Sequence, residues 1–340
     1  MRKFSVFALF LLLLLASLVL GVSVGSVDVP FPDTIRVLLS AIPGLEWAAD
    51  GIWSPYRTII IDIRLPVVLM ALFVGTGLSV SGASLQGLFR NPLVDPFIIG
   101  ISAGGALGYV AGTLLTRDAS VFVSQGVRLV LSFLFAVSTV FLAYMVSRRG
   151  SRVPLTHLLL AGIAISASVT AGTQLLVYLF VENPSKLIFS LMGSCSNSRW
   201  WELGIVSPIV VFGSAGLFLY SRDLNAFSAG EDTAKHLGVE TERTKAVVLV
   251  LASLIAAVTV PFCGMIGFVG LMVPHMVRRI IGPDQRLLLP ASALFGGAFL
   301  ILCDLASRSL MDSVIPLGIV TGFLGGGFFI YLLRAGRSGL

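Results

Sequence analysis

Residues that could do chemistry are few in this chain of 340 residues. Only 12% of the residues are charged, and there are three histidines and three cysteines. No segment matches the phosphate-binding pattern G-x-x-x-x-G-K-[ST], and neither a Gly-x-Ser-x-Gly nor a paired-Asp arrangement makes a persuasive intramembrane enzyme. Without a Cys-x-x-Cys pair, Cys195, Cys263 and Cys303 are interpreted as small apolar fillers. We therefore predict no catalytic residue, no cofactor and no metal site, and a protein that is not an enzyme.

The most informative polar stretch is the loop from Ser221 to Lys245. Ser228 and Glu231 have the spacing of a capping box, in which each side chain accepts from the other residue's backbone N–H. Acidic residues in the next turn, basic residues one turn later and a stop at Gly238 predict a helix over about 229–237. So short a helix needs a partner surface. We prefer a docking element for a soluble cytoplasmic protein, with a helix lying on the lipid surface as the alternative.

The composition places these residues in a membrane. Hydrophobic residues make up 56% of the chain, and uncharged stretches such as 4–24 and 129–147 reach the ~20 residues that a helix needs to cross a bilayer. A chain that faces lipid must satisfy its own backbone hydrogen bonds, so we predict an all-α integral membrane protein with about ten transmembrane helices. The predicted spans are 4–24, 58–89, 97–115, 122–146, 154–181, 203–220, 243–262, 265–281, 287–306 and 314–334.

The basic residues predict the orientation. With the N-terminus in the cytoplasm, 15 of the 23 Lys and Arg lie on the cytoplasmic side and 8 on the other. This predicts a multi-pass protein of the cytoplasmic (inner) membrane, one domain over 1–340, with both termini cytoplasmic. We favour a retained first helix over a signal peptide, because the apolar run is long and no clean cleavage site follows. Scattered basic residues exclude nucleic acid as a partner.

Small residues and prolines mark several helices. The stretch 75–84 is rich in glycine and serine, which suits a helix packed inside the bundle or one lining a pathway. Glycines recur every fourth residue over 100–112 and 318–326, which we interpret as internal packing, with a dimer contact or pathway wall as alternatives. Pro274 would kink its helix unless a neighbour satisfies the freed carbonyl. Short helices are expected near 34–41 and after Asn183-Pro184.

Together these segments resemble the FecCD family of ABC importer permeases, which serves iron–siderophore complexes, haem and vitamin B12. The matching pieces occur in family order from about residue 60 to the C-terminus, and the set is specific although each piece alone is weak. The pieces are Arg64-Leu-Pro66, Ser81-Gly-Ala83, Asn91-Pro-Leu93 with Pro96, Leu158-Leu-Leu-Ala-Gly162, Gly267-Phe-Val-Gly270 with Val273-Pro-His275, Leu288-Leu-Pro290 and Pro316-Leu-Gly318.

The resemblance implies a type II ABC importer permease, working as a pair, here expected to be a homodimer. Its partners would be two cytoplasmic ATPase subunits and an extracytoplasmic substrate-binding protein. It assigns ATPase coupling to a helix at about 229–238, with Gly230, Glu231, Asp232, Ala234, Lys235, Leu237 and Gly238. It assigns binding-protein docking to Arg64 and Arg308, and an inner gate to Asn91 and Thr156. Val67 stands where a second arginine often follows the Arg-Leu-Pro motif, so the docking chemistry should differ in part.

The resemblance leaves the substrate open. Iron–siderophore or haem is the leading expectation and cobalamin the runner-up, while molybdate-type oxyanions stay open. A secondary transporter or channel is the rival of a different class, and it would need ionisable groups at the middle of the membrane to couple ions. The charges of this chain lie mostly near the ends of the predicted spans.

Overall fold

The computed structural model describes residues 2–25, 27–117, 119–150, 152–181, 184–310 and 313–335. All regular elements in these ranges are helices, which confirms the predicted all-α class. The helices are α1 (Arg2–Ser23), α2 (Phe31–Ser40), η1 (Glu46–Ala49), α3 (Ser54–Arg57), η2 (Thr58–Arg64), α4 (Leu65–Phe89), η3 (Pro96–Ile99), α5 (Ile101–Leu115), α6 (Val121–Ser147), α7 (Leu155–Phe180), α8 (Pro184–Leu191), α9 (Trp200–Leu219), α10 (Ser221–Ser228), α11 (Glu231–His236), α12 (Thr241–Cys263), α13 (Val269–Ile281), α14 (Gln285–Ser309) and α15 (Leu317–Ala335).

Ten of the described helices correspond to the ten predicted spans. Seven helical stretches in the described ranges are long and apolar enough to cross a membrane, and α5 and α15 are shorter apolar helices. Two predicted starts are corrected by backbone geometry. Helix α5 begins only at Ile101, because Pro96–Ile99 forms a separate 3-10 turn and Gly100 has a φ of 105°. Helix α13 begins only at Val269, because Phe268 before it has a φ of 68°.

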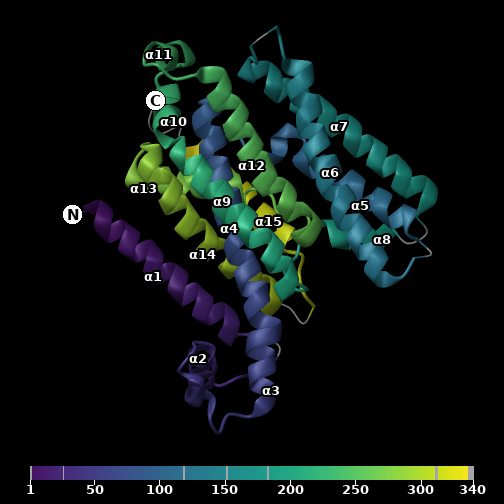
Figure 1. Ribbon diagram of the computed structural model, residues 1–340, viewed down its shortest axis with the longest axis vertical. Coiled ribbons are helices and arrows are strands. Elements are labelled where there is room, and N and C mark those ends of the chain that lie inside the picture. The colour runs from purple at the N-terminus through teal and green to yellow at the C-terminus, as the bar shows by residue number, and fades with distance from the viewer. Residues whose placement is uncertain are drawn as a thin grey trace.

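Helix α4 lies at the centre of the bundle, in contact with α9, α12, α13 and α14 (Figure 1). Every residue from Gly77 to Leu88 is buried. Its glycines allow backbones to touch: a Cβ on Gly82 would lie 1.8 Å from the Gly270 oxygen of α13. Of the two alternatives for this small-residue stretch, the structure therefore shows packing inside the bundle.

The two glycine stripes have different surroundings. On α5 the stripe faces α6, since a Cβ on Gly104 or Gly108 would lie 2.4 and 2.2 Å from carbonyl oxygens of that helix. The α5 stripe is thus internal packing, as predicted. On α15, Gly318 packs on the Met192 carbonyl, but a Cβ on Gly322 or on Gly326 would meet no described atom within 4 Å. Gly322 and Gly326 of α15 are therefore not covered by another described helix of the single chain.

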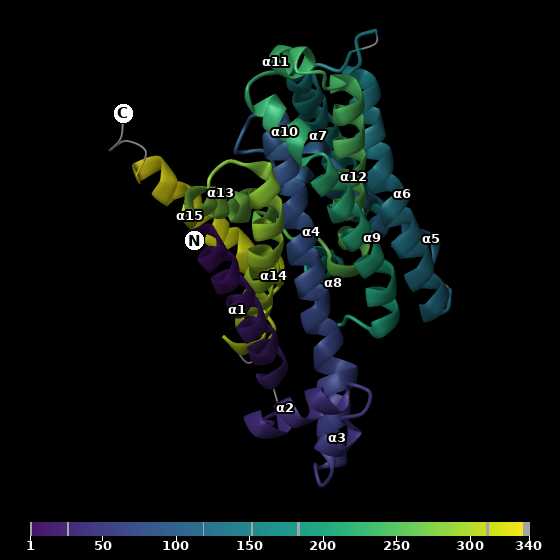
Figure 2. The same ribbon diagram turned by 60° about the vertical axis from the view of Figure 1, so that its left-hand side comes forward.

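The two ends of the bundle carry different short helices. Figure 2 shows α10 and α11 at one end, and α2 and α3 at the opposite end. Helix α2 agrees with the helix predicted near 34–41, and α8 with the one expected after Pro184, while Asn183 lies outside the described residues. We call these the α11 end and the α2 end.

Candidate functional site

The predicted coupling helix exists but begins differently from the prediction. It spans Glu231–His236 as α11, after a glycine turn that separates it from α10. The capping box is wrong: the Ser228 hydroxyl donates to the Leu224 carbonyl at 3.2 Å inside α10. Gly230, with a φ of 123°, takes the N-cap position, where a side chain would be strained. Gly238, with a φ of 86°, follows the helix as predicted.

Helix α11 has one buried and one exposed face. Ala234 is fully buried, which seats the helix on the bundle. Asp232, Lys235 and Leu237 are exposed, and Leu237 keeps 68% of its surface accessible. An apolar side chain ringed by charges of both signs is the pattern of a protein contact, with an apolar centre and a polar rim.

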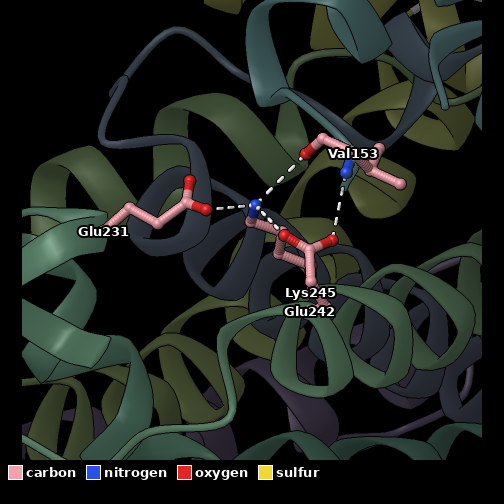
Figure 3. Close-up of polar contacts among 4 residues, drawn as sticks. All are labelled: Val153, Glu231, Glu242 and Lys245. Carbon is pink, nitrogen blue, oxygen red and sulfur yellow. Dashed lines mark hydrogen bonds and ion pairs between the residues drawn. The ribbon is translucent and has the colours of Figure 1, made fainter. Parts of the chain in front are cut away.

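Behind α11 lies a buried ammonium group, shown in Figure 3. The Lys245 side chain on α12 is only 2% exposed. Its Nζ donates to Glu231 Oε1 of α11 at 2.5 Å, to Glu242 Oε1 at 2.8 Å and to the Val153 carbonyl at 3.1 Å. Glu242 Oε2 in turn accepts from the Val153 N–H at 3.0 Å. The network thus joins α11, α12 and the segment that leads into α7.

Beside this network, the surface at the α11 end contains a pocket lined by basic residues, which we call the basic hollow. It has a volume of about 510 Å³ and lies between the ends of α4, α10 and α13. Arg90, Arg278, Arg279 and His275 line it, and no acidic residue does. Neither ring nitrogen of His275 has a hydrogen-bond partner among the described residues. Such a hollow is suited to an anionic group.

The predicted gate residue Asn91 lines the same basic hollow. Its Oδ1 accepts from the Leu93 N–H at 2.9 Å, which shapes the turn after α4. Asp95 in this turn is buried and accepts from the Phe97 N–H at 2.8 Å. Burial raises the pKa of the Asp95 carboxyl to about 6, although the Phe97 N–H partly opposes this rise.

Helix α10 is fixed to the start of α14 by one amide side chain. Asn225 Nδ2 donates to Asp284 Oδ1 at 2.7 Å, and Asn225 Oδ1 accepts from the Gln285 N–H at 2.8 Å. Hydrogen bonding from Arg286 is the main cause that lowers the pKa of the half-buried Asp284 to about 2. The base of the predicted coupling helix is therefore held to a long helix of the bundle.

The other predicted gate residue is placed elsewhere. Thr156 is exposed on the first turn of α7 and does not line the basic hollow with Asn91. Polar side chains farther along α7, Ser168, Thr170 and Gln174, are exposed as well. Helix α7 is the least buried of the seven candidate spans, with 6% of its apolar window buried. Large apolar side chains of α7, such as Leu160, Ile163 and Leu175, are exposed beside these polar ones, so much of this helix is uncovered in the single chain.

The two predicted docking arginines meet at the last turn of α1. Arg64 donates through Nη1 to the carbonyls of Val22 and Ser23, at 3.0 and 2.7 Å. Arg308 Nη2 donates to the Gly21 carbonyl at 3.3 Å, and it pairs with Asp304 at 2.8 Å. Carbonyls at a helix C-terminus have no partner within the helix, and arginines satisfy them well.

This geometry shows that Arg64 is buried against α1, while its assignment to binding-protein docking stays a prediction. Its side chain is 5% exposed, and its donors are occupied by the chain's own carbonyls. Arg308 is half-buried, with 13% of its side chain exposed. Burial therefore argues that Arg64 positions α1 in this conformation.

Two residues of the network were not singled out from the sequence. Glu242 and Lys245 are spaced i and i+3 at the start of a span, a spacing that places them on one helix face. This spacing could have indicated an ion pair between Glu242 and Lys245. Nothing in the spacing indicates Glu231 or Val153 as partners, because these contacts depend on how distant segments pack.

No three residues of the types His, Cys, Asp and Glu gather closely enough to hold a metal ion in the described ranges. The three cysteines are free and buried, as interpreted. The Sγ atoms of Cys195 and Cys263 lie 3.6 Å apart. No chemistry of a resident cofactor can be assigned to these residues.

Known proteins are similar to this chain in sequence and in fold. A model of the FecCD transport family matches residues 12–335. The chain is 39% identical to the cobalamin import system permease protein BtuC of Halobacterium salinarum, over 90% of this chain and 85% of that protein. It is 36% identical to the hemin transport system permease protein HmuU of Yersinia pestis, over 97% and 96%. A solved inward-facing metal-chelate type ABC transporter matches with a TM-score of 0.83 and 32% identity, over 97% of this chain and 98% of that one.

Proposed function

Because this chain belongs to the FecCD transport family, we propose that it is the membrane-spanning permease subunit of an ABC importer for a metal chelate. The permease passes the chelate inward, and ATP hydrolysis on partner subunits drives the step. The proposed cargo is an iron–siderophore complex or haem, with cobalamin as the alternative. Relatives named for hemin and for cobalamin both support a metal chelate, without separating the two.

The observation that carries the proposal is the exposed face of α11. Asp232, Lys235 and Leu237 point outward while Ala234 and the Lys245 network hold the helix from behind. A short helix with an apolar anchor fits a groove in a soluble partner. We propose that each of two ATPase subunits receives one such helix. The basic hollow beside α10 extends this surface and suits carboxylates of the same partner.

The exposed helices support a second permease copy. Helix α7 exposes Thr170 and Gln174, which lipid would not solvate, and α15 exposes the bare backbone at Gly322 and Gly326. We propose that an identical copy faces these helices and that the pathway runs between the copies. Thr156 and Asn91 would then gate its inner end.

The proposed orientation follows from the charges. The α11 end, with Arg90, Arg278 and Arg279, faces the cytoplasm of a cell with this protein in its inner membrane, and both termini are on that side. The α2 end faces an extracytoplasmic binding protein. Arg308, half-buried at that end, is retained as a docking candidate, and Arg64 acts by holding α1.

The proposal is tested by purifying the tagged chain from its native membranes in mild detergent, with mass spectrometry of the proteins that accompany it. A P-loop ATPase should accompany the chain and should be lost when residues 231–237 are scrambled. A control scrambles the short helix α2 at the opposite end, which should keep the ATPase. Recovery of the chain with no ATPase, together with transport in vesicles that lack ATP, would favour an ion-coupled secondary transporter.

A further inference from the structure

One buried ammonium group connects the coupling helix to the start of α7. A lysine ammonium has three N–H donors, and Lys245 directs them to three acceptors on three different segments. Glu231 belongs to α11, Glu242 to the first turn of α12, and Val153 to the segment before α7. Lys3 and Lys235, by contrast, are exposed.

The connection to α7 is stiff. Both backbone groups of Val153 are held, its carbonyl by Lys245 and its N–H by Glu242. Val153 is itself 1% exposed. Pro154 follows with a φ of −65°, which the proline ring fixes, and α7 begins at the next residue. A displacement of Val153 is therefore passed to the first turn of α7, where Thr156 lies.

Charge and burial make the network move as a unit. A buried ammonium that loses one of its two carboxylate partners loses part of its charge compensation, which is unfavourable. If a partner protein shifts α11, Glu231 moves, and Lys245 must either lose this acceptor or follow it. Following it also moves Glu242 and Val153, since both share the same cation. A concerted shift keeps all three hydrogen bonds of the ammonium.

We infer that Lys245 is a positioning residue that passes a displacement of the coupling helix to α7. The inference rests on the proposed function, because it needs an ATPase that moves α11. In it, Glu231 receives the displacement, Lys245 transmits it and Val153 delivers it to the proposed inner gate. Direct packing of α11 on the bundle through Ala234 would hold the helix in place without this selective transmission.

The test uses the complete complex with its ATPase in liposomes, carrying Thr156→Cys as a reporter. The labelling rate of this thiol by a polar maleimide is measured with and without ATP plus vanadate. In the parent complex, ATP should change the rate by about fivefold or more, the range of typical coupling between sites. In Glu231→Ala the ATPase should still bind and hydrolyse ATP, while the labelling change is lost. Glu240→Ala is the matched control, since this nearby exposed carboxylate pairs with Arg243 and does not bond Lys245, and it should keep the change.

Two further variants separate transmission from simple stability. Lys245→Met should lose the change as Glu231→Ala does, and Lys245→Arg, which keeps a cation with several donors, should restore part of it. A parental ATP response in Glu231→Ala or in folded Lys245→Met would overturn the inference. A parent complex without ATPase or without any ATP response would instead overturn the proposed function.

Discussion

Gln86 of α4 donates through Nε2 to the Gly270 carbonyl of α13 at 3.3 Å. Gly270 precedes Pro274 by four residues, so its carbonyl is the one that the missing proline N–H leaves without a partner. Gln86 also donates to the Leu271 carbonyl at 3.2 Å. The neighbour that a proline-containing membrane helix needs is thus supplied from the central helix, which keeps α4 and α13 in contact.

Replacement of Gln86 should therefore destabilise the fold. Gln86→Met keeps the side-chain size but leaves buried carbonyls unsatisfied, which costs about 1–3 kcal/mol. Unfolding by a denaturing detergent, followed by circular dichroism, measures the loss. Gln174→Met on the exposed side of α7 is the control and should stay near the parent. Equal stability of the two variants would contradict the role of Gln86.

The contact of Gly82 with Gly270 gives a second prediction. Gly82→Ala places a methyl group where a Cβ would lie 1.8 Å from a backbone oxygen, so the two helices must separate. Overpacking of this kind costs about 1–3 kcal/mol, and the melting temperature should fall. The same change at Gly326, which meets no described atom within 4 Å, should leave the single chain unaffected. A smaller loss for Gly82→Ala than for Gly326→Ala would refute the close approach.

The first two predictions show where sequence was sufficient. Runs of apolar residues indicated the ten helices that match the predicted spans, and Pro274 indicated that a neighbour must satisfy a freed carbonyl. The identity of that neighbour, Gln86, could not be predicted, because it lies 184 residues away. The glycine stripes predicted close packing, but only the fold shows that the α5 stripe is covered while part of the α15 stripe is open.

In the candidate site, features that depend on local sequence were predicted, and contacts between distant segments were not. A short helix in this loop and its stop at Gly238 follow from local patterns. The capping box failed because the Glu231 carboxylate has a stronger partner, the buried cation of Lys245, which no local pattern reveals. Nothing in the sequence indicated that Arg64 binds the carbonyls at the end of α1, because that contact depends on how α1 packs.

Asp95 should make stability depend on pH. Its pKa of about 6 lies above the ordinary 3.8, so the folded protein holds a proton that the unfolded chain has released between about pH 4 and 6. The contribution of this group to stability is therefore present at low pH and falls as the pH rises to 6, by roughly 3 kcal/mol at most.

Asp95→Asn tests this dependence, because an amide stays neutral and its Oδ1 still accepts from Phe97. The variant should melt at a higher temperature than the parent at pH 7.5 and at nearly the same temperature at pH 4.5. Melting curves of the detergent-solubilised protein at both values are the measurement. A gain of equal size at the two pH values would show that Asp95 does not titrate in this window.

Arg64 should act on α1 and not on the binding protein. Arg64→Met leaves the last carbonyls of α1 without their donor, so the segment 24–30 should become more sensitive to protease added at the α2 end. Binding-protein affinity, measured on the folded fraction by surface plasmon resonance, should change less than twofold, about 0.4 kcal/mol. An affinity loss without any change in proteolysis would restore the docking role of Arg64.

The central claim is that ATP on a partner subunit drives a metal chelate through this permease. The most direct measurement is uptake into liposomes that hold the permease with its co-purified ATPase and binding protein, with ATP on the α11 side. Haem, a ferric siderophore and cobalamin are supplied separately as labelled cargo. Uptake of one of them should require ATP and should disappear when residues 231–237 are scrambled. Uptake that proceeds without ATP and follows an ion gradient would contradict the claim.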